Sequence, residues 1–204
     1  MLLHLHPETP QPRLVSKIAE HLKAGGVIIY PTDTIYGLGC DIYNHKAIER
    51  ICKIKNIEPQ KAQLSFICRD LSNLSDYTKS INTPLYRILK SHLPGPYTFI
   101  LPAAKEVPKK LWSKRKTVGI RVPNHAVSLK LVEELGNPII STSTTNRHGE
   151  ILIDPFEIKN IFNAHVDLML ASGNLSGDPS SVVDLSEDEP EIIREGAGDV
   201  SLFV

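Results

Sequence analysis

Hydroxyl-bearing residues gather directly after a short apolar run, in residues 32–39 (TDTIYGLG). The run before them, residues 27–30, is rich in β-branched side chains and is stopped by Pro31, which predicts a buried strand. Ligands of open α/β sheets bind beyond strand ends, where backbone and short side chains converge. The segment is therefore a candidate site for a small polar ligand. Taken alone, it fits a purely structural Asp/Thr turn equally well.

Two further polar clusters follow other predicted strands. Residues 141–147 (STSTTNR) leave the apolar pair Ile139-Ile140 with five hydroxyl residues, an amide and a guanidinium, and hydroxyls bind phosphate and ribose oxygens well. The third cluster combines residues 179–184 (PSSVVD) with Arg194, which could form a structural ion pair or bind a phosphate. Arg121 adds a guanidinium between apolar residues at the end of another strand.

Several familiar signatures are absent from the sequence. It has no GxxxxGK[ST] phosphate loop, and Gly37-Leu38-Gly39 lacks the third glycine of a dinucleotide fingerprint. HExxH, GxSxG and protein-kinase motifs are also missing, and the eight histidines show no metal-ligand spacing. These absences argue against both standard nucleotide folds and against a metal centre.

Charge is balanced overall but uneven along the chain. Twenty-three Lys and Arg residues against 23 Asp and Glu residues exclude a protein that binds polyanions through bulk charge. Residues 105–121 are strongly basic, whereas residues 184–199 are strongly acidic. Two interpretations stay open: the stretches are solvated surfaces that face each other, or the basic stretch binds phosphate.

Composition predicts a folded protein of one domain, residues 1–204. Its 204 residues, 41% hydrophobic and 23% charged, suffice for a core, and no repeat or linker divides them. No stretch approaches the ~20 apolar residues of a membrane span, and the N-terminus lacks the pattern of a signal peptide. We therefore expect a cytoplasmic protein without membrane contact. Cys40, Cys52 and Cys68 form no Cys-x-x-Cys pair and are expected to be buried.

Hydrophobic periodicity predicts alternating helices and strands. Residues 12–23 have helical spacing of apolar positions and end at a glycine pair that can form a C-cap. Further helices are predicted over residues 45–55, 83–91, 125–135 and 155–162. Strands are predicted over residues 27–30, 64–68, 97–101, 117–122, 138–142, 167–170 and 182–185. This interleaving predicts an α/β fold of the α+β type, with a twisted mixed β-sheet flanked by helices.

In order and over nearly its whole length, the chain resembles the YrdC/YciO family, the L-threonylcarbamoyladenylate synthases and their relatives. The resemblance implies a single YrdC-like domain with an open cleft. It is carried by five blocks: GGVIIYPTDTIYGLG (25–39), LPGPYTFIL (93–101), TVGIRVPNH (117–125), IISTSTTN (139–146), and PSSVVD with IIREGAGD. The YciO branch is the most similar, through RICKIKN (50–56), ICRDLSNLSDY (67–77) and KEVPKKL (105–111).

The resemblance implies that ATP, L-threonine and bicarbonate condense to threonylcarbamoyl-AMP, with release of pyrophosphate, for later transfer to adenosine 37 of tRNA. It also implies Mg²⁺ bound with ATP and catalysis by positioning and charge; it assigns no catalytic residue. Carried over to this sequence, the residues expected to bind threonine or its carbamate are Thr34, Tyr36 and Arg121. Those expected to bind the nucleotide are Lys55, Ser141, Ser143, Asn146, Ser181 and Arg194.

The sequence departs from the family pattern at two motifs that handle phosphate. The Lys-x-Arg motif reads Lys55-Asn56-Ile57, and the Ser-x-Asn motif reads Ser143-Thr144-Thr145, with Asn146 one residue late. Replacing a guanidinium by an alkyl side chain is not conservative. Three hypotheses follow: a synthase with full or altered activity, a non-catalytic protein that binds double-stranded RNA or tRNA, and a folded relic without activity.

The RNA hypothesis draws on the concave basic face described for domains of this family. Basic side chains suit contacts with the RNA backbone, and Trp112 would supply one stacking platform. The residues expected to bind RNA are Lys109, Lys110, Lys114, Arg115 and Lys116.

Overall fold

The structure is a computed structural model that describes residues 1–58, 64–79, 81–105, 107, 116–146, 148–187 and 189–203. Its helices are α1 (Pro12–Lys23), α2 (His45–Ile54), α3 (Thr83–His92), α4 (Ala126–Leu135) and α5 (Pro155–Phe162). Its strands are β1 (Leu2–His4), β2 (Ile28–Tyr30), β3 (Gly37–Asp41), β4 (Ser65–Ile67), β5 (Tyr97–Pro102), β6 (Thr117–Arg121), β7 (Ile139–Ser143), β8 (Leu168–Ala171), β9 (Ser181–Asp184) and β10 (Glu191–Arg194).

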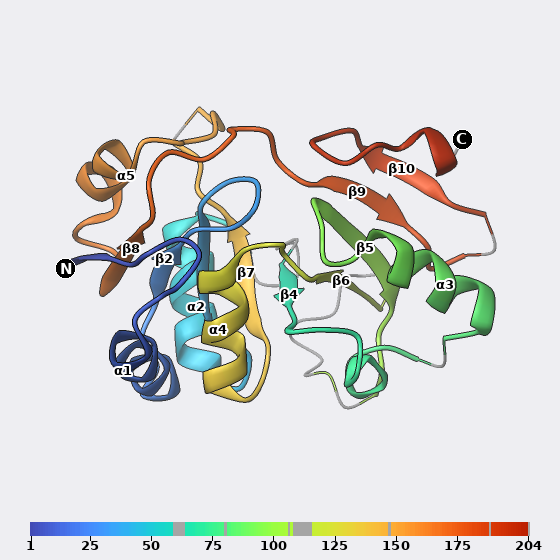
Figure 1. Ribbon diagram of the computed structural model, residues 1–204, viewed down its shortest axis with the longest axis horizontal. Coiled ribbons are helices and arrows are strands. Elements are labelled where there is room, and N and C mark those ends of the chain that lie inside the picture. Colours follow the sequence, from blue (N-terminus) through green and yellow to red (C-terminus); the bar gives the residue numbers. More distant parts are fainter. Residues whose placement is uncertain are drawn as a thin grey trace.

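Within the described part of the chain, the ten strands form one sheet in the order β1-β8-β2-β3-β7-β4-β6-β5-β9-β10 (Figure 1). The pairing is mixed: β2–β8, β4–β6 and β5–β9 are parallel, whereas β2–β3, β3–β7 and β5–β6 are antiparallel. Helices α1, α2 and α4 gather at the β2–β3–β7 half of the sheet, and α3 lies at the β5–β9–β10 half (Figure 1). The predicted fold class is confirmed.

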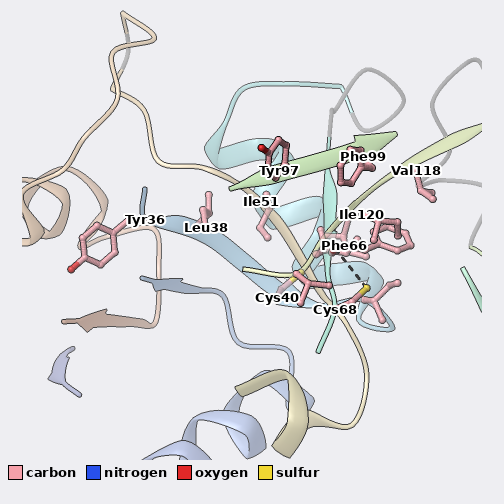
Figure 2. Close-up of a cluster of buried hydrophobic side chains, with 14 of the residues drawn as sticks. Tyr36, Leu38, Cys40, Ile51, Phe66, Cys68, Tyr97, Phe99, Val118 and Ile120 are labelled. Carbon is pink, nitrogen blue, oxygen red and sulfur yellow. Dashed lines mark hydrogen bonds between the residues drawn. The ribbon is translucent and has the colours of Figure 1, made fainter. Parts of the chain in front are cut away.

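Two hydrophobic clusters share the strands between them. Ile29 belongs to a larger cluster with α2 and the aromatic residues of β4 and β5, while its neighbours Ile28 and Tyr30 belong to a cluster with α1 and α4. Successive side chains of a strand point to opposite faces, so the two clusters cover opposite faces of the sheet. Figure 2 shows side chains of the larger cluster, among them Ile51 of α2, Phe66 of β4 and Phe99 of β5.

Local sequence signals explain where the helices begin and end. α1 begins at Pro12, whose missing N–H is not needed there, and Gly25 follows its C-terminus with a left-handed φ of 95°. The Asn44 side chain accepts a hydrogen bond from Ala47 N at 3.0 Å and caps α2. At the other end of α2, Asn56 takes the left-handed conformation (φ 52°).

The sequence-based boundaries agree with the structure except at three strands. Residues 37–39, expected in a loop, begin β3, because Gly37 and Gly39 allow this strand to approach its neighbours closely. A Cβ added at Gly39 would lie 2.7 Å from Ile139 Cγ2 and 2.8 Å from Ile140 O. β1 and β10 were not predicted at all; both are edge strands of only three and four residues, too short for a clear alternation pattern.

Two further expectations concern the burial of the cysteines and the lengths of the helices. Cys40, Cys52 and Cys68 are free and buried, as predicted, and burial raises the pKa of the Cys68 thiol to about 12. Among the described residues, none of the helices has the length and apolar character needed to cross a bilayer.

Candidate functional site

An open cleft of about 1930 Å³ lies on one face of the sheet. Along the strands of its floor, alternate residues face it: Ser65 and Ile67 of β4, Thr98 and Ile100 of β5, and Thr117, Gly119 and Arg121 of β6. The intervening Phe66, Phe99, Val118 and Ile120 belong to the larger cluster below (Figure 2). Predicted site residues that line the cleft are Tyr36, Lys55, Arg121, Ser141, Ser143, Asn146 and Arg194.

Arg121 is a nearly buried guanidinium, 7% exposed, at the end of β6. Its Nη2 donates to Asp33 Oδ1 and Thr34 Oγ1, both at 2.5 Å, and to Thr32 Oγ1 at 3.2 Å. Its Nε is buried without a hydrogen-bond partner. A buried donor without an acceptor is costly, so a ligand oxygen in the cleft would stabilise Arg121.

Lys55 brings a second cation to the cleft from the C-terminus of α2. Its Nζ donates to Thr145 Oγ1 at 2.5 Å and to Ser143 O at 3.1 Å. Partial burial lowers the pKa of this lysine, because desolvation penalises the charged form. No ion pair joins Lys55 to a carboxylate of the described residues.

Arg194 supplies a third cation from β10. Its Nε and Nη2 donate to Ser180 O at 3.0 and 2.7 Å, and Nη2 also reaches Ser180 Oγ at 3.3 Å. Desolvation, and then the nearby charge of Arg121, lower the pKa of Arg194. Within the described chain, Arg194 forms no ion pair, so the structural ion pair considered for it is not found there.

Ser141 lies on β7, and its hydroxyl oxygen accepts a hydrogen bond from a buried tyrosine. The phenol of the fully buried Tyr30 donates to Ser141 Oγ at 2.7 Å. The serine proton is therefore free to be donated to a ligand in the cleft. Ser143, two residues further on the same strand, also lines the cleft.

Four predicted site residues have side chains that are engaged within the protein: Thr34, Tyr36, Asn146 and Ser181. Thr34 is fully buried behind Arg121 and does not line the cleft. Tyr36 lines the cleft but is fully buried, and its hydroxyl donates to Gly173 O at 2.6 Å. The Asn146 side chain binds within its own turn, donating to Glu150 Oε2 at 2.6 Å. The Asn146 amide is therefore engaged within its own loop. Thr145, one residue earlier, stands where the family motif has its asparagine.

Ser181 is the clearest departure among the nucleotide candidates. Its buried hydroxyl donates to Gly198 O at 2.6 Å and accepts from Gly196 N and Gly198 N, each at 3.0 Å. Ser180 lines the cleft in its place, together with Val182 and Asp184. The reason is the alternation of side chains along β9, which turns Ser181 to the other face.

The basic run falls mostly outside the described residues. Lys109, Lys110, Lys114 and Arg115 lie there, and Lys116 is exposed directly before β6, so the RNA expectation stays a prediction. The acidic stretch does reach the cleft: Asp184 and Glu191, paired across β9 and β10, line it. No group of three or more metal-ligating side chains occurs among the described residues.

Sequence reasoning missed several residues that shape the site. Asp33 and Thr145 hold Arg121 and Lys55, and Tyr30 holds Ser141. These partners come from distant parts of the chain, so no local pattern pairs them. Ser180 could have been found by following the two-residue alternation of β9 backwards from Asp184.

The chain is similar to known proteins over most of its length. A family model described as "Telomere recombination", which covers Sua5, YciO and YrdC, matches residues 20–196. Escherichia coli K12 YciO is 44% identical over 98% of each chain. The crystal structure of E. coli YciO superposes with a TM-score of 0.94, over 100% of this chain and 99% of that one.

Two further relatives have a named function or a bound ligand. The threonylcarbamoyl-AMP synthase of Chromobacterium violaceum is 35% identical over 71% of this chain and 74% of its own. The structure of P. abyssi Sua5 complexed with L-threonine is 25% identical, with a TM-score of 0.89, and covers 96% of this chain and 57% of that chain. This chain therefore belongs to the Sua5/YciO/YrdC family.

Proposed function

We propose that the protein forms threonylcarbamoyl-AMP and pyrophosphate from ATP, L-threonine and bicarbonate. The observation that carries the proposal is the distribution of cations along the cleft. Arg121 is paired with Asp33, and its buried Nε has no hydrogen-bond partner. Lys55 and Arg194 form no ion pair with a carboxylate of the described residues. A single carboxylate suits the first environment, and a polyanion suits the second.

L-Threonine would bind at the Arg121 end of the cleft. Its carboxylate would accept hydrogen bonds from the nitrogens of Arg121 that Asp33 and the threonines leave free. Tyr36 is another lining residue of the same cleft. The P. abyssi relative bound to L-threonine supports this choice of ligand.

ATP would bind toward Lys55, Ser141 and Arg194. Lys55 and Arg194 offer charged donors, and Ser141 offers the hydroxyl proton that Tyr30 leaves free. In the reaction the amine of L-threonine and bicarbonate first form the carbamate with loss of water. A carbamate oxygen then attacks the α-phosphate, the bond to the β,γ-phosphates breaks, pyrophosphate leaves, and negative charge builds up on phosphate oxygens. These donors would stabilise that charge and hold the two reactants in line.

Mg²⁺ would accompany ATP, since it is usually held by phosphates, water and one or two carboxylates. Asp184 and Glu191, paired across β9 and β10, line the cleft and would supply such carboxylates. When bound, the ion neutralises charge on the departing pyrophosphate.

The direct test supplies the purified protein with ATP, Mg²⁺, L-threonine and bicarbonate. Chromatography would follow pyrophosphate and the adenylate, beside an authentic synthase. Product that requires both threonine and bicarbonate supports the proposal. ATP binding without any such product would contradict it and would favour RNA binding or an altered substrate.

Replacing Arg194 with alanine is expected to weaken ATP binding by about 1–3 kcal/mol, because one charge-assisted contact is lost. Calorimetry with Mg²⁺ and ATP measures the change. Arg69→Ala is the matched control, since Arg69 is 60% exposed and pairs with Asp70 and Glu133. Equal ATP affinity of Arg194→Ala and the parent would remove Arg194 from the nucleotide site.

Restoring the family guanidinium at Ile57 is expected to increase ATP affinity. Ile57 lines the cleft two residues after Lys55, so Ile57→Arg would add a donor beside the phosphates and strengthen binding by roughly 10-fold. Ile57→Leu, which adds no charge, should leave the affinity unchanged. A Kd for ATP that is no lower in Ile57→Arg than in Ile57→Leu would show that the phosphates bind elsewhere.

A further inference from the structure

Asp33 is a nearly buried carboxylate that binds Arg121 but does not itself line the cleft. Its side chain is 10% exposed. Oδ1 accepts from Arg121 Nη2 at 2.5 Å, and Oδ2 accepts from the backbone N of Asn124 at 3.0 Å. Both carboxylate oxygens are thus engaged, one by the guanidinium and the other by the segment that leads into α4.

The surroundings of Asp33 are held firmly in place. The segment after Asn124 continues into α4, where Ser128 Oγ donates to Pro31 O at 2.6 Å. The loop of Asp33 is therefore tied to α4 at Pro31 and, through Asp33 itself, to the segment just before α4 at Asn124. A carboxylate fixed in this way can fix the plane of the guanidinium that it binds.

The consequence concerns which nitrogens of Arg121 remain for a ligand. Nη2 is surrounded by three protein acceptors, from Asp33, Thr32 and Thr34, while Nε is buried without a partner. An arginine side chain loses considerable rotamer freedom when a ligand has to order it. Ordering by Asp33 before the ligand arrives removes that cost.

We propose that Asp33 is a positioning residue, which orients Arg121 for the carboxylate of the amino-acid substrate. The inference rests on the proposed function, because it takes L-threonine as the ligand of this end of the cleft. Asp33 also balances the charge of Arg121. Arg121 then offers directed N–H donors whose charge is already paired, whereas Lys55 and Arg194 form no ion pair with a described carboxylate. The surroundings of Arg121 therefore favour a single carboxylate over a polyphosphate.

The test compares two ligands that differ only in the carboxylate. L-Threonine and L-threoninamide are titrated by calorimetry, without bicarbonate, into the parent, Asp33→Asn and Asp33→Glu. Asn removes the charge at nearly constant shape, whereas Glu keeps the charge and displaces it. Asp70→Asn is the matched control, because Asp70 is exposed, accepts from Ser72 N and pairs with the exposed Arg69.

Both Asp33 variants are expected to lose affinity for L-threonine by about 10-fold and to keep the affinity of the parent for L-threoninamide and ATP. The amide and ATP affinities report that the variant is folded. If Asp33→Asn fails to fold, Asp33→Glu carries the same comparison.

Each other result overturns the inference in its own way. Equal losses for both ligands would mean that Asp33 only maintains the fold. Unchanged or tighter binding of L-threonine by Asp33→Asn would mean that its charge merely opposes the ligand. These two results leave the proposed function standing if the parent binds L-threonine, whereas a parent that binds neither ligand overturns both.

Discussion

Replacing Arg121 with alanine is expected to lower the affinity for L-threonine by about 100-fold, the equivalent of roughly 2.7 kcal/mol. The reason is that the substitution removes the buried guanidinium that lines the cleft beside Asp33. Hydrogen bonds to charged groups contribute about 1.5–3 kcal/mol each, and a ligand carboxylate would lose at least one. Calorimetry with L-threonine measures the change directly.

The control for this experiment must address Asp33, which Arg121→Ala leaves buried and without its cation. An unpaired buried charge destabilises a protein, so Arg121→Lys is made in parallel. It keeps a positive charge beside Asp33 but loses the planar set of donors. We expect Arg121→Lys to have the same free energy of unfolding as the parent and still to bind L-threonine roughly 10-fold more weakly. Threonine binding that survives in both variants would place the amino acid elsewhere in the cleft.

Replacing Gly39 with alanine is expected to destabilise the fold by about 3 kcal/mol or more, at the upper end of overpacking effects. Gly39 lies in β3 between β2 and β7. A Cβ there would approach Ile139 Cγ2 to 2.7 Å, Ile140 O to 2.8 Å and Tyr30 Cε1 to 2.9 Å. The backbone oxygen cannot rotate away, so the strands must separate. Urea unfolding measures the loss.

Gly136→Ala separates this steric effect from the general cost of removing a glycine. Gly136 caps α4 with a φ of 83°, and a Cβ there would meet nothing within 4 Å. Its substitution should cost only the left-handed backbone penalty of roughly 1–2 kcal/mol. If Gly39→Ala is no less stable than Gly136→Ala, β3 tolerates a side chain and does not require the close approach.

The Gly39 effect also bears on the cleft. Gly37 and Gly39 pair with Ser143 and Ser141 across β3 and β7, and a Cβ at Gly37 would lie 2.9 Å from Ser141 Oγ. The glycines of β3 thus keep space free beside a hydroxyl proposed for the nucleotide site. A loop, which the sequence predicted for residues 37–39, would not need this space.

The sequence by itself determined the order of most helices and strands and the chemistry available at their ends. The helix at residues 12–23 and the strands at 97–101 and 117–122 follow from periodicity, which is a property of neighbours along the chain. The ordered motifs also determined the family. For the same reason, the sequence placed Lys55 and Arg121 at element ends, and the structure brings them to one cleft together with Arg194.

Only the tertiary structure decided which side chains face the cleft and what holds them. Ser180 and Ser181 are neighbours of one type, yet the alternation and register of β9 against β5 place only Ser180 in the cleft. Arg121 binds Asp33, which is 88 residues away in the sequence, and Lys55 binds Thr145, which is 90 residues away. Such contacts arise from the packing of strands and helices far apart in the chain, so no local pattern encodes them.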